Sequence, residues 1–170
     1  MVIKNILSKE SEDMLSQAFE LCEDGNYSEA LKVYDSVIKK DPKNVNALID
    51  KAATLQNLGK VNQAIRLYDK ALKINPKSLD ALLNKGSALH TLEKYSEAIK
   101  CYDLAIKVDG QSAMALAYKG LSLGELGNLQ DAIKHFKKAL KIDQNYDLAN
   151  ISKKLAQDLL KESTKKSKTL

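Results

Sequence analysis

The stretch that decides the fold runs from Tyr95 to Val108 and reads YSEAIKCYDLAIKV. Ala98, Tyr102 and Ala105 are spaced three or four residues apart, so they share one side of a helix. The pattern of an alanine, an aromatic residue and a third apolar residue recurs at intervals of 34 residues. The other copies are Tyr27–Lys40, Val61–Ile74 and Leu129–Ile142. A fixed period of this length is typical of stacked helical repeats.

A second apolar helical pattern precedes each copy and follows the same period. Leu48, Leu82 and Leu116 occupy one matching place in it, and Gly86 and Gly120 occupy another. Strand-type alternation is absent, and the chain of 170 residues contains only two prolines. These patterns predict an all-α protein, a right-handed α-solenoid of four 34-residue helix-turn-helix repeats followed by a capping helix.

The period also predicts the borders of the units. The expected order is an N-terminal extension, four repeats, a capping helix and a basic disordered tail: 1–10, 11–44, 45–78, 79–112, 113–146, 147–160 and 161–170. Residues 1–9 either extend the first helix backwards or form a mobile arm. In the capping helix we expect one apolar stripe to pack on the last repeat, and this stripe consists of Leu148, Ile151, Leu155 and Leu159.

The repeat resembles the tetratricopeptide repeat (TPR) family, a family of 34-residue helix-turn-helix units. Repeat two alone supplies the matching small, large, aromatic and proline residues Leu48, Ala52, Leu55, Gly59, Ala64, Tyr68, Ala71 and Pro76. The match departs from the family pattern where lysine or glutamine stands in place of a common leucine, at Gln17, Lys51, Lys85 and Lys119. We interpret the recurring lysines and aspartates as solvated helix faces.

Small residues inside the predicted helices indicate close packing. Glycine in a helix costs about 1 kcal/mol relative to alanine, so Gly86 and Gly120 suggest a close neighbour there. The recurring alanines and the aromatic residue four places after each are predicted to be core residues rather than site residues.

The charge and the apolar segments of the chain limit the classes of function that we expect. The net charge of +5 is concentrated at the C-terminal end, where Lys161, Lys165, Lys166 and Lys168 face only Glu162. No apolar run reaches the roughly 20 residues that cross a bilayer, and no signal peptide is recognisable at the start. We therefore expect a cytoplasmic protein that does not bind membranes, with Cys22 and Cys101 as free thiols.

No catalytic or cofactor-binding motif is present. His90 and His135 lie 45 residues apart at different places of the repeat, so neither predicts a metal site or a nucleophile pair. We expect no enzyme activity, no cofactor and no metal.

The resemblance implies that certain first-helix residues line a concave groove, which is the binding surface of such repeats. The candidate groove residues are Leu15, Phe19, Ile49, Ala53, Asn57, Leu83, Ser87, His90, Met114, Ala117 and Leu121. The groove positions contain no lysine or arginine and are fringed by acidic residues: Glu12, Glu23, Asp80 and Glu125. Some of the apolar residues could instead pack only against neighbouring first helices.

This composition separates two modes of peptide binding. Family members that hold the acidic C-terminus of heat-shock chaperones use lysine, asparagine and arginine as a carboxylate clamp. The corresponding places here hold Leu15, Phe19, Asp50, Asp80 and Asn84, so no clamp is expected. We expect a protein-interaction scaffold or adaptor whose partner is an amphipathic helix or apolar segment with basic flanks.

Two alternatives stay open. A second copy of the chain could fill the groove, with Val2, Ile3, Ile6 and Leu7 or the helix carrying Leu155 and Leu159 as the insert. Weak RNA binding through the basic tail is the other, although an acidic groove opposes contact with phosphates.

Overall fold

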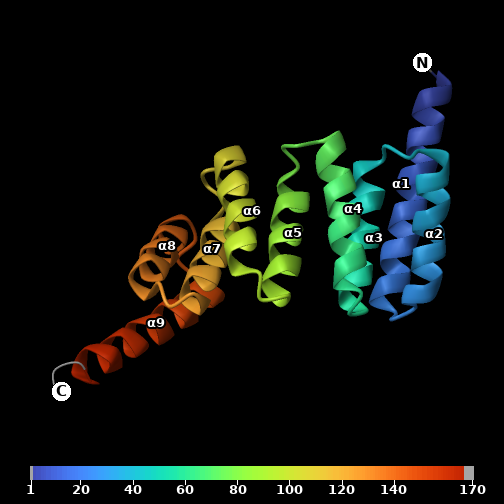
Figure 1. Ribbon diagram of the computed structural model, residues 1–170. Helices are drawn as coiled ribbons and strands as arrows, with labels where there is room; N and C mark the ends of the chain where they lie inside the picture. Colours follow the sequence, from blue (N-terminus) through green and yellow to red (C-terminus); the bar gives the residue numbers. More distant parts are fainter. Residues whose placement is uncertain (1, 167–170) are drawn as a thin grey trace. The chain divides into compact units, whose positions relative to one another are not determined.

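The computed structural model describes the backbone of residues 2–166 and the side chains of residues 9–164. Within residues 2–166 the chain forms nine α-helices and no strand, as expected from the sequence (Figure 1). The helices are α1 (Val2–Glu23), α2 (Tyr27–Lys40), α3 (Val45–Asn57), α4 (Val61–Ile74), α5 (Leu79–Thr91), α6 (Tyr95–Val108), α7 (Ala113–Glu125), α8 (Leu129–Ile142) and α9 (Asp147–Lys166).

The helices fall into two units, the first ending at Asn84 and the second beginning at Lys85. In the first unit α1 packs on α2, α2 on α3 and α3 on α4; in the second, α6, α7, α8 and α9 pack in the same consecutive way. First helices also touch one another, α1 with α3 and α7 with α9. This is the packing of an all-α solenoid of helical repeats.

Turn and cap residues set the helix ends. Gly25, Gly59 and Gly127 each follow a first helix and take positive φ angles of 73° to 76°, which glycine adopts without strain. Glu93 takes the same place between α5 and α6 with a φ of 58°. Helix α3 begins where Asn44 accepts a hydrogen bond of 2.9 Å from the backbone N–H of Ala47, which satisfies an otherwise free donor.

The recurring residues form the core. The four fixed alanines and the four aromatic residues are all buried: Ala30, Ala64, Ala98 and Ala132, with Tyr34, Tyr68, Tyr102 and Phe136. The aromatic rings pack where the preceding first helix carries a small residue. A Cβ atom added to Gly120 would lie 2.7 Å from Cε1 of Phe136, and one added to Gly86 would meet the ring of Tyr102. The close neighbours predicted from these glycines are confirmed.

Two of the recurring lysines, Lys51 and Lys119, do not lie on solvated faces, so that interpretation is wrong for them. Their partners Asp35 and Asp103 are exposed as expected. Lys51 forms an ion pair with Asp35 of the preceding second helix, and Lys119 donates a 2.6 Å hydrogen bond to Asp103 in the same way. Both lysine side chains are mostly buried. The long lysine stem is largely removed from water at the place where the tetratricopeptide repeat pattern commonly has leucine, while the ammonium group reaches a carboxylate.

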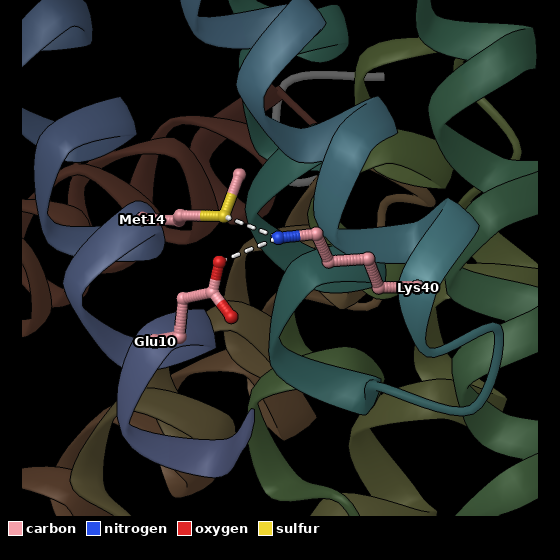
Figure 2. Close-up of polar contacts among 3 residues, drawn as sticks. All are labelled: Glu10, Met14 and Lys40. Atoms are coloured by element: carbon pink, nitrogen blue, oxygen red, sulfur yellow. Dashed lines mark hydrogen bonds and ion pairs between the residues drawn. The ribbon is translucent and has the colours of Figure 1, made fainter. Parts of the chain in front are cut away.

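Helix α1 begins at Val2, so the backbone of residues 2–9 extends the first helix rather than forming an arm. The side chains of Val2, Ile3, Ile6 and Leu7 lie outside the described residues. The end of α2 is linked to α1 by Lys40, whose Nζ donates to Oε1 of Glu10 at 2.7 Å and lies 3.9 Å from Sδ of Met14 (Figure 2).

Helix α9 differs from expectation in two ways. It continues to Lys166, so residues 161–166 of the expected disordered tail are helical. Lysine and glutamate favour helix formation, and Nζ of Lys161 lies 3.6 Å from Oδ1 of Asp158 one turn earlier. The expected apolar stripe is also not the buried face. Ile151, Leu155 and Leu159 are exposed, whereas Ala149 and Ala156 are buried. Small residues allow α9 to approach α7 and α8 closely, and this outweighs the larger apolar area of the stripe.

Two glycines of α7 give a matched test of this packing. We predict that Gly120→Ala lowers the free energy of unfolding by about 1–3 kcal/mol, because the new methyl group overlaps the buried ring of Phe136. Gly124→Ala meets no atom within 4 Å and should raise it by up to about 1 kcal/mol through helix propensity. Urea denaturation followed by circular dichroism measures both; equal effects of the two substitutions would contradict the close contact.

Candidate functional site

The first unit contains a hollow of about 540 Å³ formed by α1, α3 and the first turn of α5. It is lined by Glu12, Leu15, Ser16, Phe19, Glu20, Asn46, Ile49, Asp50 and Asp80. Its walls contain both apolar side chains from α1 and α3 and carboxylates. The hollow can therefore offer both apolar contact and negative charge to a bound group.

Three candidate groove residues, Leu15, Phe19 and Ile49, line this hollow. Phe19 is 61% exposed and presents its ring to solvent, whereas Ile49 is only 6% exposed. Ala53, Asn57 and Leu83 also belong to the first unit but do not line the hollow. Leu83 is buried, so it offers little surface to a partner.

The sequence reading missed three lining residues, Ser16, Glu20 and Asp50. In the sequence, Asp50 is notable only as a residue that fails to match the carboxylate clamp. The sequence does carry one signal that Asp50 lines the groove, because it directly follows the predicted groove residue Ile49. Adjacent residues on a helix are turned by about 100°, which places Asp50 at the edge of the face that contains Ile49.

The charge of this hollow has one sign. Glu12, Glu20, Asp50 and Asp80 line it, and no lysine or arginine is among its lining residues. Burial raises the pKa of the Asp50 carboxyl to about 6, and the nearby charge of Asp80 raises it further in the same direction. None of the ion pairs among the described residues includes Asp50, so its ionised form is stabilised by no cation there and costs more than that of a free aspartate.

The remaining candidate groove residues belong to the second unit. Met114 is exposed and Ala117 is fully buried. Leu121 borders a smaller hollow of about 200 Å³ beside Gly124, Leu155 and Leu159.

His90 has a structural partner. Its Nδ1 lies 2.9 Å from Oγ of Ser122, a fully buried hydroxyl on α7, and its ring contacts the edge of Tyr95 at a centroid distance of 5.1 Å. In the first unit, Sγ of Cys22 lies 3.3 Å from Oγ1 of Thr54. Cys22 and His90 occupy the same place in their repeats, and both satisfy a buried hydroxyl of the next first helix.

The first unit also has a hollow of about 420 Å³ between α2, α3 and α4, and its charge is of the opposite sign. Lys60, Arg66 and Lys70 line it, while Lys51 there is already paired with Asp35. It contains none of the candidate groove residues.

Among the described residues, no group of three or more His, Cys, Asp or Glu side chains is arranged to hold a metal ion. None of the helices described combines the length and the apolar character needed to cross a membrane.

Comparisons with known proteins agree with this architecture. The family model of the anaphase-promoting complex (cyclosome) subunit 3 matches residues 23–105, and the tetratricopeptide repeat model matches residues 113–146. The chain belongs to the tetratricopeptide repeat family, a class of protein-binding scaffolds. A search of the curated proteins gave no match.

Solved structures share the fold. A crystal structure of MamA has a TM-score of 0.77 and 26% identity, over 95% of this chain and 90% of that chain. PilF of Pseudomonas aeruginosa has a TM-score of 0.85 at 18% identity, over 92% of this chain and 71% of that one. The first TPR domain of Spaghetti (RPAP3), bound to the HSP90 peptide SRMEEVD, has a TM-score of 0.67 at 23% identity, over 71% of this chain and 95% of that one.

The electrostatics of Asp50 give a pH-dependent prediction. Its pKa is about 6 in the folded chain and 3.8 without the fold, so the folded chain binds the proton more tightly between these values. The contribution of Asp50 to the free energy of unfolding should therefore fall as pH rises from about 4 to 7. Asp50→Asn should remove this loss and raise the free energy of unfolding at pH 7.5 by about 1 kcal/mol, with solvent screening of this part-exposed group taken into account.

Urea denaturation of wild type and Asp50→Asn at pH 4 and pH 7.5 measures this effect. The two proteins should be about equally stable at the lower pH and differ at the higher one. A substitution that destabilises the chain at pH 7.5 would show that the Asp50 carboxylate is held by a favourable partner instead.

Proposed function

We propose that this protein is a non-enzymatic scaffold of the cytoplasm, which binds an apolar or amphipathic segment with basic flanks in the acidic hollow of its first unit. The observation that carries the proposal is the exposed ring of Phe19 in a hollow with four carboxylates and no lysine or arginine. Membership of the TPR family supports the scaffold role.

Apolar burial would supply most of the affinity. Covering a phenylalanine side chain contributes roughly 1.5–3 kcal/mol, and Phe19 is the most exposed apolar residue of the hollow. Leu15 adds a half-buried neighbour, and Ile49 forms a buried part of the wall. We assign direct contact to Leu15 and Phe19 and a supporting role to Ile49.

The carboxylates would select the charge of the partner. A lysine or arginine beside the apolar segment would neutralise Asp50 and relieve its repulsion from Asp80. An acidic peptide would meet like charge from four side chains. The peptide SRMEEVD in the RPAP3 structure carries two glutamates and an aspartate, so it suits a different kind of groove and serves here as a negative control.

RNA binding is the weaker candidate. The basic hollow lined by Lys60, Arg66 and Lys70 and the basic C-terminal end could attract phosphates, but the predicted groove residues share a surface with carboxylates. Binding to a single-stranded RNA that disappears on deletion of residues 161–170 would reflect only charge at the tail.

The defined test uses two synthetic amphipathic peptides of about 15 residues, long enough to form a helix on binding. They share a leucine face and carry either lysines or glutamates at both ends. The lysine-flanked peptide should bind by fluorescence anisotropy, and Phe19→Glu should weaken it by roughly tenfold or more through loss of apolar contact. The added negative charge cannot explain such a loss, because it would attract the lysines.

Leu104→Glu on α6 is the matched control, since Leu104 is also an exposed apolar residue and lies outside the hollow. It should leave the affinity unchanged. Equal affinity for the two peptides and for SRMEEVD, or no effect of Phe19→Glu, would refute the proposed mode. A pull-down from the source cells with wild type and Phe19→Glu then identifies the natural partner.

A further inference from the structure

Helix α9 presents an apolar stripe to solvent. Ile151, Leu155 and Leu159 are 69%, 60% and 45% exposed and are spaced four residues apart on one side of the helix. The stripe is about 12 Å long, because eight steps of 1.5 Å each separate Ile151 from Leu159. Leu155 and Leu159 also border the hollow of about 200 Å³ next to Gly124, where the missing side chain leaves open space.

The register of α9 explains why the stripe is exposed. Ala149 and Ala156 lie 34 residues after Ala115 and Ser122 of α7, and all four are buried. Helix α9 therefore packs as the first helix of a further repeat. By the same register, Ile151 and Leu155 correspond to Ala117 and Leu121, which are candidate groove residues.

A second helix packed on α9 as α8 packs on α7 would not cover the stripe. In α7, the side that faces the second helix α8 includes Leu116 and Gly120, which pack with Phe136 of α8. The corresponding residues of α9 are Asn150 and Lys154, both polar and exposed. The apolar stripe lies on another side of α9 and needs a different occupant.

The charges beside the stripe identify that occupant. At 100° per residue, Asp147, Lys154, Asp158 and Lys161 follow the solvent side of the stripe, so acidic and basic residues are mixed along it. Within the chain Asp158 lies 3.6 Å from Lys161, an exposed pair of small energetic weight. Unlike the acidic hollow of the first unit, this surface is complementary to itself, as a two-fold interface requires.

We propose that α9 pairs with α9 of a second copy of the chain, in antiparallel orientation and centred on Leu155. This register places Ile151 opposite Leu159 of the partner subunit. It also brings Lys154 beside Asp158 of the partner subunit, with an offset of about 3 Å along the helix axis. Two-fold symmetry produces each of these contacts twice. The interface residues belong to the second unit and the hollow around Phe19 is formed by the first unit, so the proposed contact uses none of the residues of the proposed binding site.

The test is sedimentation equilibrium of the full chain over a range of concentrations. Wild type should change from monomer to dimer, and Leu155→Glu should remain monomeric because it places two carboxylates at the centre. Leu104→Glu, with a similarly exposed leucine on α6, should dimerise like wild type. Circular dichroism confirms that both variants keep their helices, and Ile151→Lys provides a second variant at the most exposed position.

Charge reversal tests the register. Lys154→Asp and Asp158→Lys should each weaken the dimer at least tenfold, because like charges then face each other at two places, and the double variant should regain wild-type affinity. Nonspecific apolar association would not show this rescue. A wild type that stays monomeric at every concentration, a dimer that survives Leu155→Glu, or a double variant without rescue would each overturn the proposal.

Discussion

The fold depends on how closely a first helix can approach the aromatic ring of the second helix that follows. At Gly86 and Gly120 no side chain separates the helix backbone from Tyr102 and Phe136. Such close contact fixes the helix pair because interiors are packed with few voids, so even one extra methyl group must displace its neighbours. The equivalent places in the first two repeats, at intervals of 34 residues, hold the small residues Ala18 and Ala52, which are also fully buried.

This constraint explains which parts of the fold the sequence could predict. The helices and the buried alanines follow from the period alone. The buried face of α9 did not, because apolar area pointed to Leu155 and Leu159, whereas the structure buries Ala149 and Ala156. The small-residue rule that explains the repeats applies to α9 as well.

The candidate site was predictable in its apolar part and not in its charges. Leu15, Phe19 and Ile49 come from the repeat register, and the structure brings them into one hollow. The raised pKa of Asp50 depends first on burial and then on the charge of Asp80. The repeat register places both residues in one groove, but no sequence pattern encodes the burial. The same holds for the pairing of Lys119 with Asp103, which requires two repeats to be packed together. Local sequence patterns thus define single helices better than the electrostatics between them.

The central functional claim is that the acidic hollow of the first unit is the binding surface. The most direct measurement is a two-dimensional NMR titration of the labelled full chain with the lysine-flanked peptide. The amide signals of Phe19, Ile49 and Asp50 should shift with a common saturation curve while those of Lys60, Arg66 and Lys70 stay unchanged. Shifts confined to the basic hollow between α2, α3 and α4, or no saturable shift around Phe19, would contradict it.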